Sequence, residues 1–278
     1  MDEHSPQRTE LPLPLWRSGV ASYQSLTPVQ LQMHDSFLES KARIFVVLCS
    51  RRIGKSYWAL TECDSLARRK PRAKIKYAAQ TSKEVHEIVI PLMDEIMESC
   101  PRSERPTFHK SELVWEWKNG SRMVAAGCDN GNYTRLRGTG ADLCIIDEAG
   151  FIDDLRKVLY STLLPQCLTT GGRIILPSSP SLTPAHDFHS VVAEADKNSA
   201  LVVKTIHDAT HIDKGLVEEF CREVGGAETS DWRREYLAQF VTDDEYMIGP
   251  QFTTANVNEP AIPAYRQRYV GIDPGFTD

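Results

Sequence analysis

Residues 44–56 read Ile44-Phe-Val-Val-Leu-Cys-Ser-Arg-Arg-Ile-Gly-Lys-Ser56. The first six form a continuous apolar run, which is typical of a strand buried on both faces. The closing Gly-Lys-Ser is the ending of a phosphate-binding loop (P-loop), although Cys49 stands where such loops usually begin with glycine. A helix is expected to follow as far as about Arg68, so that backbone N–H groups and the helix dipole converge on an anion. The stretch therefore predicts a strand, a P-loop and a helix.

A second motif, Leu143-Cys-Ile-Ile-Asp-Glu148, is an apolar strand that ends in two carboxylates. Such a strand can present its last carboxylate to the Mg²⁺ of a nucleotide at the carboxyl edge of a parallel sheet. We assign Asp147 and the Ser56 hydroxyl to Mg²⁺, Lys55 to the β- and γ-phosphates, and Glu148 to orienting the attacking water. Because the two motifs occur in this order, a site that hydrolyses ATP is favoured over the alternative that Asp147 and Glu148 only form a solvated turn.

Strand-like and helix-like segments alternate along most of the chain, which predicts an α/β fold with a mainly parallel sheet flanked by helices. Strands are expected at 44–49, 75–79, 143–146, 173–177 and 201–206, and helices at 27–39, 55–68, 82–97, from 153, near 186, at 214–224 and at 231–240. Pro91 should kink the helix that it interrupts. Segments 113–117 and 122–126 flank Asn119-Gly120, a strong hairpin signal, so we expect an antiparallel hairpin inserted in the sheet.

Two pairs of arginines are candidates for stabilising charge at the γ-phosphate. Arg51 and Arg52 lie inside the P-loop, and Arg135 and Arg137 lie in a loop with Gly138 and Gly140 just before the carboxylate strand. Phosphoryl transfer benefits from such a cation, supplied either by the same chain or by a neighbouring subunit. A flexible loop with solvated arginines accounts equally well for the second pair.

Composition excludes several classes of protein. The 278 residues are 41% hydrophobic and 25% charged, as in ordinary globular proteins, and the net charge of -6 means that any DNA contact must be local. Seven widely spaced cysteines without a C-x-x-C pair favour neither a disulfide framework nor a zinc site. No apolar stretch approaches the ~20 residues of a membrane helix, and no signal peptide is evident, so cytosol is expected.

Together these residues resemble the ATPase domain of the large terminase subunit, the DNA-packaging motor of tailed phages and herpesviruses. The P-loop, with Arg51 and Arg52 before Ile53 and no leading glycine, looks like that family. Gln30 in Leu26-Thr-Pro-Val-Gln30 is similar to the family's adenine-binding glutamine. Pro177-Ser-Ser-Pro-Ser181, after a strand, looks like the motif that couples hydrolysis to DNA movement through Ser178 and Ser179.

The resemblance implies a RecA-like P-loop fold of the ASCE type, with ATP and Mg²⁺ as cofactors. The nucleotide would be held by Gln30, Cys49, Ser50, Arg51, Arg52, Ile53, Gly54, Lys55 and Ser56. Arg51 matches the loop arginine that acts in cis, and Arg137 is placed like an arginine finger acting across subunits. The implied partners are double-stranded DNA, the portal protein, the small terminase subunit and further copies in a ring, a pentamer. The implied location is the host cytoplasm, or the nucleus for a eukaryotic virus, with transient binding to the procapsid portal.

The expected domain boundaries follow from the same motifs. We expect an N-terminal arm at 1–26, the ATPase domain at 27–241 and a linker at 242–268. Residues 269–278 include Tyr269-Val-Gly-Ile-Asp-Pro-Gly275, which resembles the first strand of an RNase H-like nuclease domain with Asp273 as a metal-binding carboxylate. Metal-dependent nucleases need several carboxylates, so no nuclease activity is expected from this partial domain.

Several of these features also have purely structural explanations. Gln30 follows Thr27 by three residues, as in a capping box. Ser178, Ser179 and Asp273 also fit turns beside prolines. Alternative functions are a helicase-like DNA translocase and a regulatory protein that binds nucleotide without turnover.

Other clusters of charged or aromatic residues are better explained by structure than by ligand binding. The six cations in residues 68–76 fit a solvated turn better than a DNA contact. His186 with His189, and His207 with His211, have metal-site spacing but no evident third ligand. Trp115 and Trp117 share a face of the hairpin, where core packing is expected.

Overall fold

The computed structural model describes residues 11–183 and 185–241, all within one compact unit. Their strands form an eight-stranded sheet in the order β3-β4-β5-β2-β6-β7-β1-β8. The six strands from β5 to β8 in this order are parallel, which confirms the predicted α/β fold. The expected linker at 242–268 and the nuclease strand with Asp273 lie outside the described residues.

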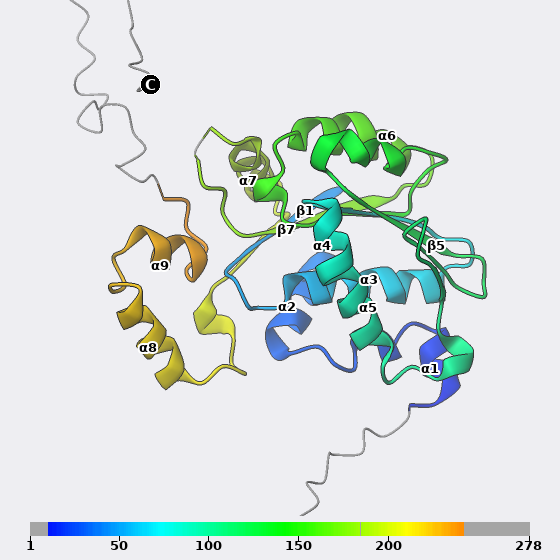
Figure 1. Cartoon of the computed structure of the whole chain (residues 1–278), viewed down its shortest axis with the longest axis horizontal. Coiled ribbons are helices and arrows are strands. Elements are labelled where there is room, and N and C mark those ends of the chain that lie inside the picture. Colours follow the sequence, from blue (N-terminus) through cyan, green and yellow to red (C-terminus); the bar gives the residue numbers. More distant parts are fainter. Residues whose placement is uncertain (1–10, 184, 242–278) are drawn as a thin grey trace, which may run out of the picture. The chain divides into compact units, whose positions relative to one another are not determined.

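The strands are β1 (Ile44–Cys49), β2 (Lys74–Ala79), β3 (Thr107–His109), β4 (Val114–Glu116), β5 (Arg122–Gly127), β6 (Leu143–Ile146), β7 (Arg173–Ser178) and β8 (Leu201–Lys204). The main helices are α1 (Leu13–Arg17), α2 (Pro28–Glu39), α3 (Lys55–Arg69), α4 (Ser82–Glu84), α5 (Ile90–Met97), α6 (Leu164–Cys167), α7 (Asp187–Lys197), α8 (Lys214–Glu223) and α9 (Ser230–Glu235). In Figure 1, α6 and α7 cover one face of the sheet, and α2, α3 and α5 lie on the other. None of the helices in the described part is long and apolar enough to cross a membrane.

Short helical turns join several of these elements. They are 3₁₀ turns at Ala21–Tyr23, Arg102–Glu104, Asp129–Leu136, Ala149–Phe151 and Ile206–Asp208, and π-helical turns at Val85–Val89 and Lys157–Leu163. The helix expected at 82–97 is interrupted just before Pro91 by the π turn at Val85–Val89. Because proline has no N–H to donate, the regular ladder is interrupted here, and Ile90 N instead donates five residues back to the Val85 carbonyl.

The predicted hairpin forms, but it extends the sheet at an edge instead of interrupting the parallel strands. β4 pairs antiparallel with β5, with Trp115 opposite Met123, while the other side of β5 pairs parallel with β2. The short strand β3, which the sequence did not reveal, adds a further antiparallel strand outside β4. Trp115 and Trp117 are 3% and 4% exposed, so their expected packing in the core is confirmed.

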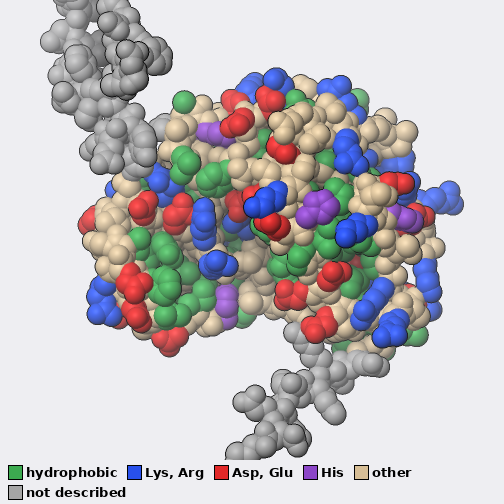
Figure 2. Space-filling model, in the orientation of Figure 1, with side chains coloured by type: hydrophobic (Ala, Val, Ile, Leu, Met, Phe, Trp, Pro, Cys, Tyr) green, Lys and Arg blue, Asp and Glu red, His purple; other side chains and the backbone are tan. Residues whose placement is uncertain are grey.

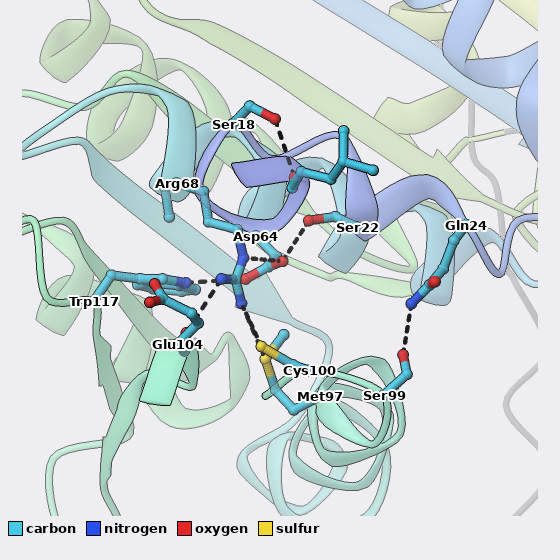
Figure 3. Close-up of polar contacts among 12 residues, drawn as sticks. Ser18, Ser22, Gln24, Asp64, Arg68, Met97, Ser99, Cys100, Glu104 and Trp117 are labelled. Carbon is cyan, nitrogen blue, oxygen red and sulfur yellow. Dashed lines mark hydrogen bonds and ion pairs between the residues drawn. The ribbon is translucent and has the colours of Figure 1, made fainter. Parts of the chain in front are cut away.

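A buried ion pair ties the first described residues to the rest of the domain (Figure 3). Arg68 Nε lies 2.7 Å from Asp64 Oδ2, and the same carboxylate accepts hydrogen bonds from Ser22 Oγ at 2.5 Å and Trp117 Nε1 at 2.9 Å. The Arg68 guanidinium also lies over the buried Trp16 ring, 5.0 Å from its centroid. Residues 11–26 therefore contribute to the domain core, and Arg68 is not exposed to a ligand such as DNA.

Candidate active site

The parallel strands bring the predicted motifs to one edge of the sheet. The P-loop follows the carboxyl end of β1, Asp147 follows that of β6, and Ser178 ends β7, which pairs with both neighbours. Since all three strands point the same way, side chains far apart in sequence meet where the strands end. Lys55 and Glu148 are such a pair.

The P-loop is a tight turn between β1 and α3. Cys49 is the last residue of β1 and is wholly buried, and burial raises the pKa of its thiol to about 12. The next amide, Ser50 N, donates to the Lys204 carbonyl at 2.9 Å, and the Ile53 side chain anchors the turn at 1% exposure. Gly54 has a φ of 83°, a left-handed conformation that glycine adopts without steric cost.

Lys55 forms an ion pair with the second carboxylate of the 143–148 motif. Its Nζ lies 2.9 Å from Glu148 Oε1, and the residue is only 7% exposed. Burial lowers the pKa of Lys55, but the carboxylates of Glu148 and Asp147 outweigh it, so the pKa is raised. The lysine therefore carries its positive charge at the start of α3, where the helix dipole adds to the attraction for phosphate.

Asp147 is held by hydrogen bonds in a buried environment. Tyr77 on the neighbouring strand β2 donates from its hydroxyl to Asp147 Oδ2 at 2.6 Å. Burial and the nearby Glu148 raise the pKa of Asp147, while Lys55, Tyr77 and a hydrogen bond with Ser56 lower it. A buried carboxylate whose ionised form is disfavoured by burial, beside a second carboxylate, is a donor set that a divalent cation would stabilise.

Glu148 adopts an unusual backbone conformation with φ of 50°. Its backbone N donates to the Pro177 carbonyl at 2.9 Å, which fixes the strained residue against the end of β7. Its Oε1 faces Lys55, but its Oε2 is buried without a hydrogen-bond partner. A carboxylate on a strained backbone, with one buried oxygen left unpaired, fits a site that receives water or a ligand.

Gln30 forms the capping box that its spacing from Thr27 indicated, and it also contacts the P-loop. Gln30 Oε1 accepts from Thr27 N at 2.8 Å, and Nε2 donates to the Gly54 carbonyl at 2.9 Å. The side chain is 4% exposed. The P-loop contact joins the start of α2 to the turn that precedes Lys55.

The two candidate coupling serines are buried beside the segment that follows Glu148. Ser178 Oγ accepts from Gly150 N at 2.8 Å and donates to the Ser179 carbonyl at 2.7 Å. A Cβ on Gly150 would lie 2.7 Å from that carbonyl and 2.9 Å from Ser178 Oγ, so only glycine allows the close approach. Ser179 Oγ is buried without a partner. These contacts connect the end of β7 to the carboxylate motif.

The loop with Arg137 is held by a residue that the sequence did not single out. Gln166 on α6 donates from Nε2 to the Leu136 carbonyl at 2.9 Å, and its own carbonyl accepts from Ala141 N at 2.9 Å. Within the loop, Thr139 Oγ1 lies 3.4 Å from Lys74 Nζ. Because Lys74 begins β2, the exposed loop lies toward the amino ends of the parallel strands. The P-loop lies at their carboxyl ends.

The P-loop arginines and the histidine pairs have distinct surroundings. Arg51 Nε lies 2.5 Å from Glu235 Oε2 on α9, and Arg52 has a φ of 66°.

His186 caps α7 by accepting from Phe188 N, while its Nε2 contacts the Ile152 carbonyl. Within residues 11–183 and 185–241, no group of three or more His, Cys, Asp or Glu side chains is arranged to hold a metal.

Several solved structures with the same fold are large terminases. The ATPase domain of the Thermus phage P74-26 large terminase has 19% identity and a TM-score of 0.60, covering 77% of this chain and 94% of that one. The large terminase of bacteriophage HK97 has 16% identity and a TM-score of 0.59, covering 77% of this chain and 50% of that one. The large terminase of a thermophilic bacteriophage has 16% identity and a TM-score of 0.63, with coverage of 78% and 54%.

The chain thus spans about half the length of the two longer terminases. No curated protein matches it in sequence. A family model described as terminase large subunit, T4likevirus-type, N-terminal, matches residues 46–251, which is most of the chain. The described residues share the fold of the large-terminase ATPase domain, and the chain belongs to the T4likevirus-type terminase large subunits.

Proposed function

We propose that the site at the carboxyl ends of β1 and β6 hydrolyses ATP and that this hydrolysis drives double-stranded DNA into a procapsid. The observation that carries the proposal is the pair of the buried Lys55 and the partly exposed Glu148, 2.9 Å apart, beside the buried Asp147. A cation, a metal-binding carboxylate and a second carboxylate with one unpaired oxygen are the groups that phosphoryl transfer to water requires.

Each side chain has a defined part in this reaction. Lys55 binds the β- and γ-phosphates, which replace Glu148 as its partner. Asp147 and Ser56 hold the Mg²⁺ ion, which neutralises developing charge on the phosphates when it is bound. Glu148, released from Lys55, accepts a hydrogen bond from the attacking water and orients it.

The backbone around these groups positions them. P-loop residues 49–56 surround the phosphates, and Gln30 holds Gly54 through its carbonyl; a contact of Gln30 with adenine remains a prediction. In this proposal Ser178 and Ser179 pass a change at Glu148 to β7, and the hydrogen bond of Ser178 with the backbone of Gly150 supports this role.

The two arginines act from different subunits. Arg51, within the P-loop, reaches the γ-phosphate of its own chain. Arg137 lies in a loop that Gln166 holds toward the amino ends of the strands, away from the P-loop of its own chain. It therefore suits a γ-phosphate on a neighbouring subunit. The active form is then a ring, a pentamer bound to the portal protein.

The further partners are the small terminase subunit and DNA, with the motor assembled in the host cytoplasm, or in the nucleus of a eukaryotic host. The test of the reaction is Mg²⁺-dependent phosphate release by the purified chain, with and without DNA and portal. Lys55→Ala should abolish hydrolysis, whereas Lys83→Ala, on a side chain that is 77% exposed, should not. Equal rates for these two variants would exclude the proposed site, and duplex unwinding by the isolated chain would favour a helicase.

A further inference from the structure

Two lysines of β2 lie next to the loop that carries Arg137. Lys74 and Lys76 are two residues apart in the strand, so their side chains leave the same face of the sheet. Lys74 Nζ lies 3.4 Å from Thr139 Oγ1, and a Cβ on Gly138 would lie 3.8 Å from Lys76 Nζ. Both ammonium groups are therefore close to the loop, and a side chain at position 138 would contact that of Lys76.

Lys76 is a half-buried cation without a negative partner. Within the described residues its side chain forms no hydrogen bond or ion pair, although it is only partly exposed. Burial lowers the pKa of Lys76, and the nearby cations Lys74 and Arg122 lower it further, while the Cys144 thiol opposes them. Proteins usually pair a charge that they take out of water, because an unpaired one is costly. An anion from outside the chain would relieve this cost.

The carboxylate closest to the two lysines in sequence is already paired. Asp142 Oδ1 lies 2.7 Å from Lys70 Nζ, and its Oδ2 accepts from the backbone N of Lys74. In the part of the chain that the structure describes, no carboxylate forms an ion pair with the side chain of Lys74, Lys76 or Arg137. Figure 2 shows further Lys and Arg side chains along the margin of the molecule where Figure 1 labels β5. This margin is therefore suited to attract an anion.

We propose that Lys74 and Lys76 join Arg137 in an anion site for the terminal phosphates of a nucleotide bound by a second copy of this chain. The inference rests on the proposed function, in which Arg137 reaches the γ-phosphate of a neighbouring subunit. An anion that meets Arg137 also comes near the two ammonium groups, because the loop lies beside their strand. A terminal phosphate carries more than one negative charge, whereas each phosphate of DNA carries one, so the nucleotide matches a cluster of three cations better. The two lysines then add to the positive charge that stabilises phosphoryl transfer.

The first test uses an acyl-phosphate derivative of ATP, which transfers its acyl group to lysine amines near the terminal phosphate and releases ATP. Unlabelled wild type and isotope-labelled Lys55→Ala chains are mixed and assembled with portal protein and DNA. The labelled chains lack the P-loop lysine but keep the three cations. We expect acylation of Lys74 or Lys76 on the labelled chains, suppressed by excess ATP, because their cations meet nucleotide held by wild-type neighbours. Mass spectrometry identifies the modified peptides and the chain they come from.

The same experiment separates failure of the inference from failure of the proposed function. Acylation of Lys55 in the wild-type chain reports nucleotide in the P-loop, and its absence would count against the proposed function and the inference together. Acylation of Lys55 with none of Lys74 or Lys76 on the labelled chains would overturn the inference alone. Acylation of these two lysines confined to wild-type chains would place them at their own nucleotide and would also contradict it. The exposed Lys110 is the internal control, because excess ATP should not change its acylation.

The second test removes the charge of Lys76. Lys76→Met keeps an unbranched apolar side chain, and turnover by the assembled motor should fall at least about tenfold, as expected when a charged hydrogen bond to phosphate is missing. The melting temperature should stay the same or rise, because an unpaired half-buried charge is lost. Lys110→Met should change neither quantity. Turnover at the wild-type rate would refute the inference, and a melting temperature that falls together with turnover would assign Lys76 to the fold instead.

Binding of duplex DNA distinguishes the nucleotide from the other phosphate-bearing partner. Fluorescence anisotropy should give the same DNA affinity for Lys76→Met and for wild type. A weaker affinity for DNA at unchanged turnover would assign the three cations to DNA and overturn the inference.

Discussion

Gln30 Nε2 donates a 2.9 Å hydrogen bond to the carbonyl of Gly54, the residue that sets the left-handed turn before Lys55. The same amide caps α2 by accepting from Thr27 N. One side chain thus fixes the start of a helix and the shape of the P-loop. A Cβ on Gly54 would lie 2.4 Å from Gln30 Nε2, so the contact also requires glycine at position 54.

Gln30→Ala should therefore weaken both stability and nucleotide binding. We expect a loss of about 1 kcal/mol in the free energy of unfolding, from the cap and the lost hydrogen bond. KM for ATP should rise because Gly54 loses its support. Chemical denaturation and steady-state kinetics measure the two effects. Equal losses for ATP and GTP would indicate that Gln30 acts through the loop, whereas a loss selective for ATP would show contact with the base.

Glu148→Gln should separate binding from turnover. The amide keeps the shape of the side chain but cannot act as a base toward water, so turnover should fall by at least about a hundredfold. Nucleotide affinity should be retained, because Lys55 and Asp147 remain. The control is Glu87→Gln, on a side chain that is 60% exposed. Turnover by Glu148→Gln at the wild-type rate would remove Glu148 from the reaction.

Arg137→Ala should poison mixed assemblies if this arginine acts on a neighbouring subunit. Arginine fingers contribute about 10³-fold or more to turnover, so each mutant subunit would silence the adjacent site. ATPase activity of mixtures with wild type should fall more steeply than the mutant fraction. Arg135→Ala is the matched control, since Arg135 contacts the Glu112 carbonyl of its own chain at 3.5 Å. A strictly linear decline for Arg137→Ala would argue against action between subunits.

Asp64→Ala should destabilise the domain without a direct effect on the active site. The substitution leaves the buried guanidinium of Arg68 without its charge partner and removes acceptors for Ser22 and Trp117. Breaking a buried pair in this way costs about 3–5 kcal/mol. Thermal and urea denaturation would measure the loss, with the exposed Asp94→Ala as control. Equal stability of the two variants would show that the network contributes nothing net.

The pair of His34 and Glu62 should make stability depend on pH. His34 Nδ1 lies 2.6 Å from Glu62 Oε1, and this hydrogen bond, partly offset by burial, raises the pKa of His34. A raised pKa adds stability that is fully present below the unfolded pKa of about 6.5 and is lost as pH rises through the folded pKa. The stability advantage of wild type over His34→Gln, followed by urea denaturation, should therefore shrink toward alkaline pH. An advantage that grows with pH would reverse this assignment.

Patterns between residues close in sequence were enough to predict most of the strands and helices and the chemistry that they carry. Apolar runs such as 44–49 and 143–146 are typical of buried strands, and Gly-Lys-Ser between the first of them and an expected helix indicates a phosphate-binding turn. The order of these motifs also gave the family. Such signals are readable because hydrophobic periodicity and turn chemistry act between residues close in sequence.

The contacts between residues far apart in sequence could be seen only in the folded domain. The edge position of the hairpin and the strand β3 follow from pairing with β2 and β4, for which local sequence has no signal. Tyr77 on Asp147 and Glu235 on Arg51 likewise depend on strand order and on where α9 packs. Gln166 holds the Arg137 loop from across 30 residues of chain. These contacts depend on the packing of whole elements against one another, because burial and electrostatics act through space and not along the chain.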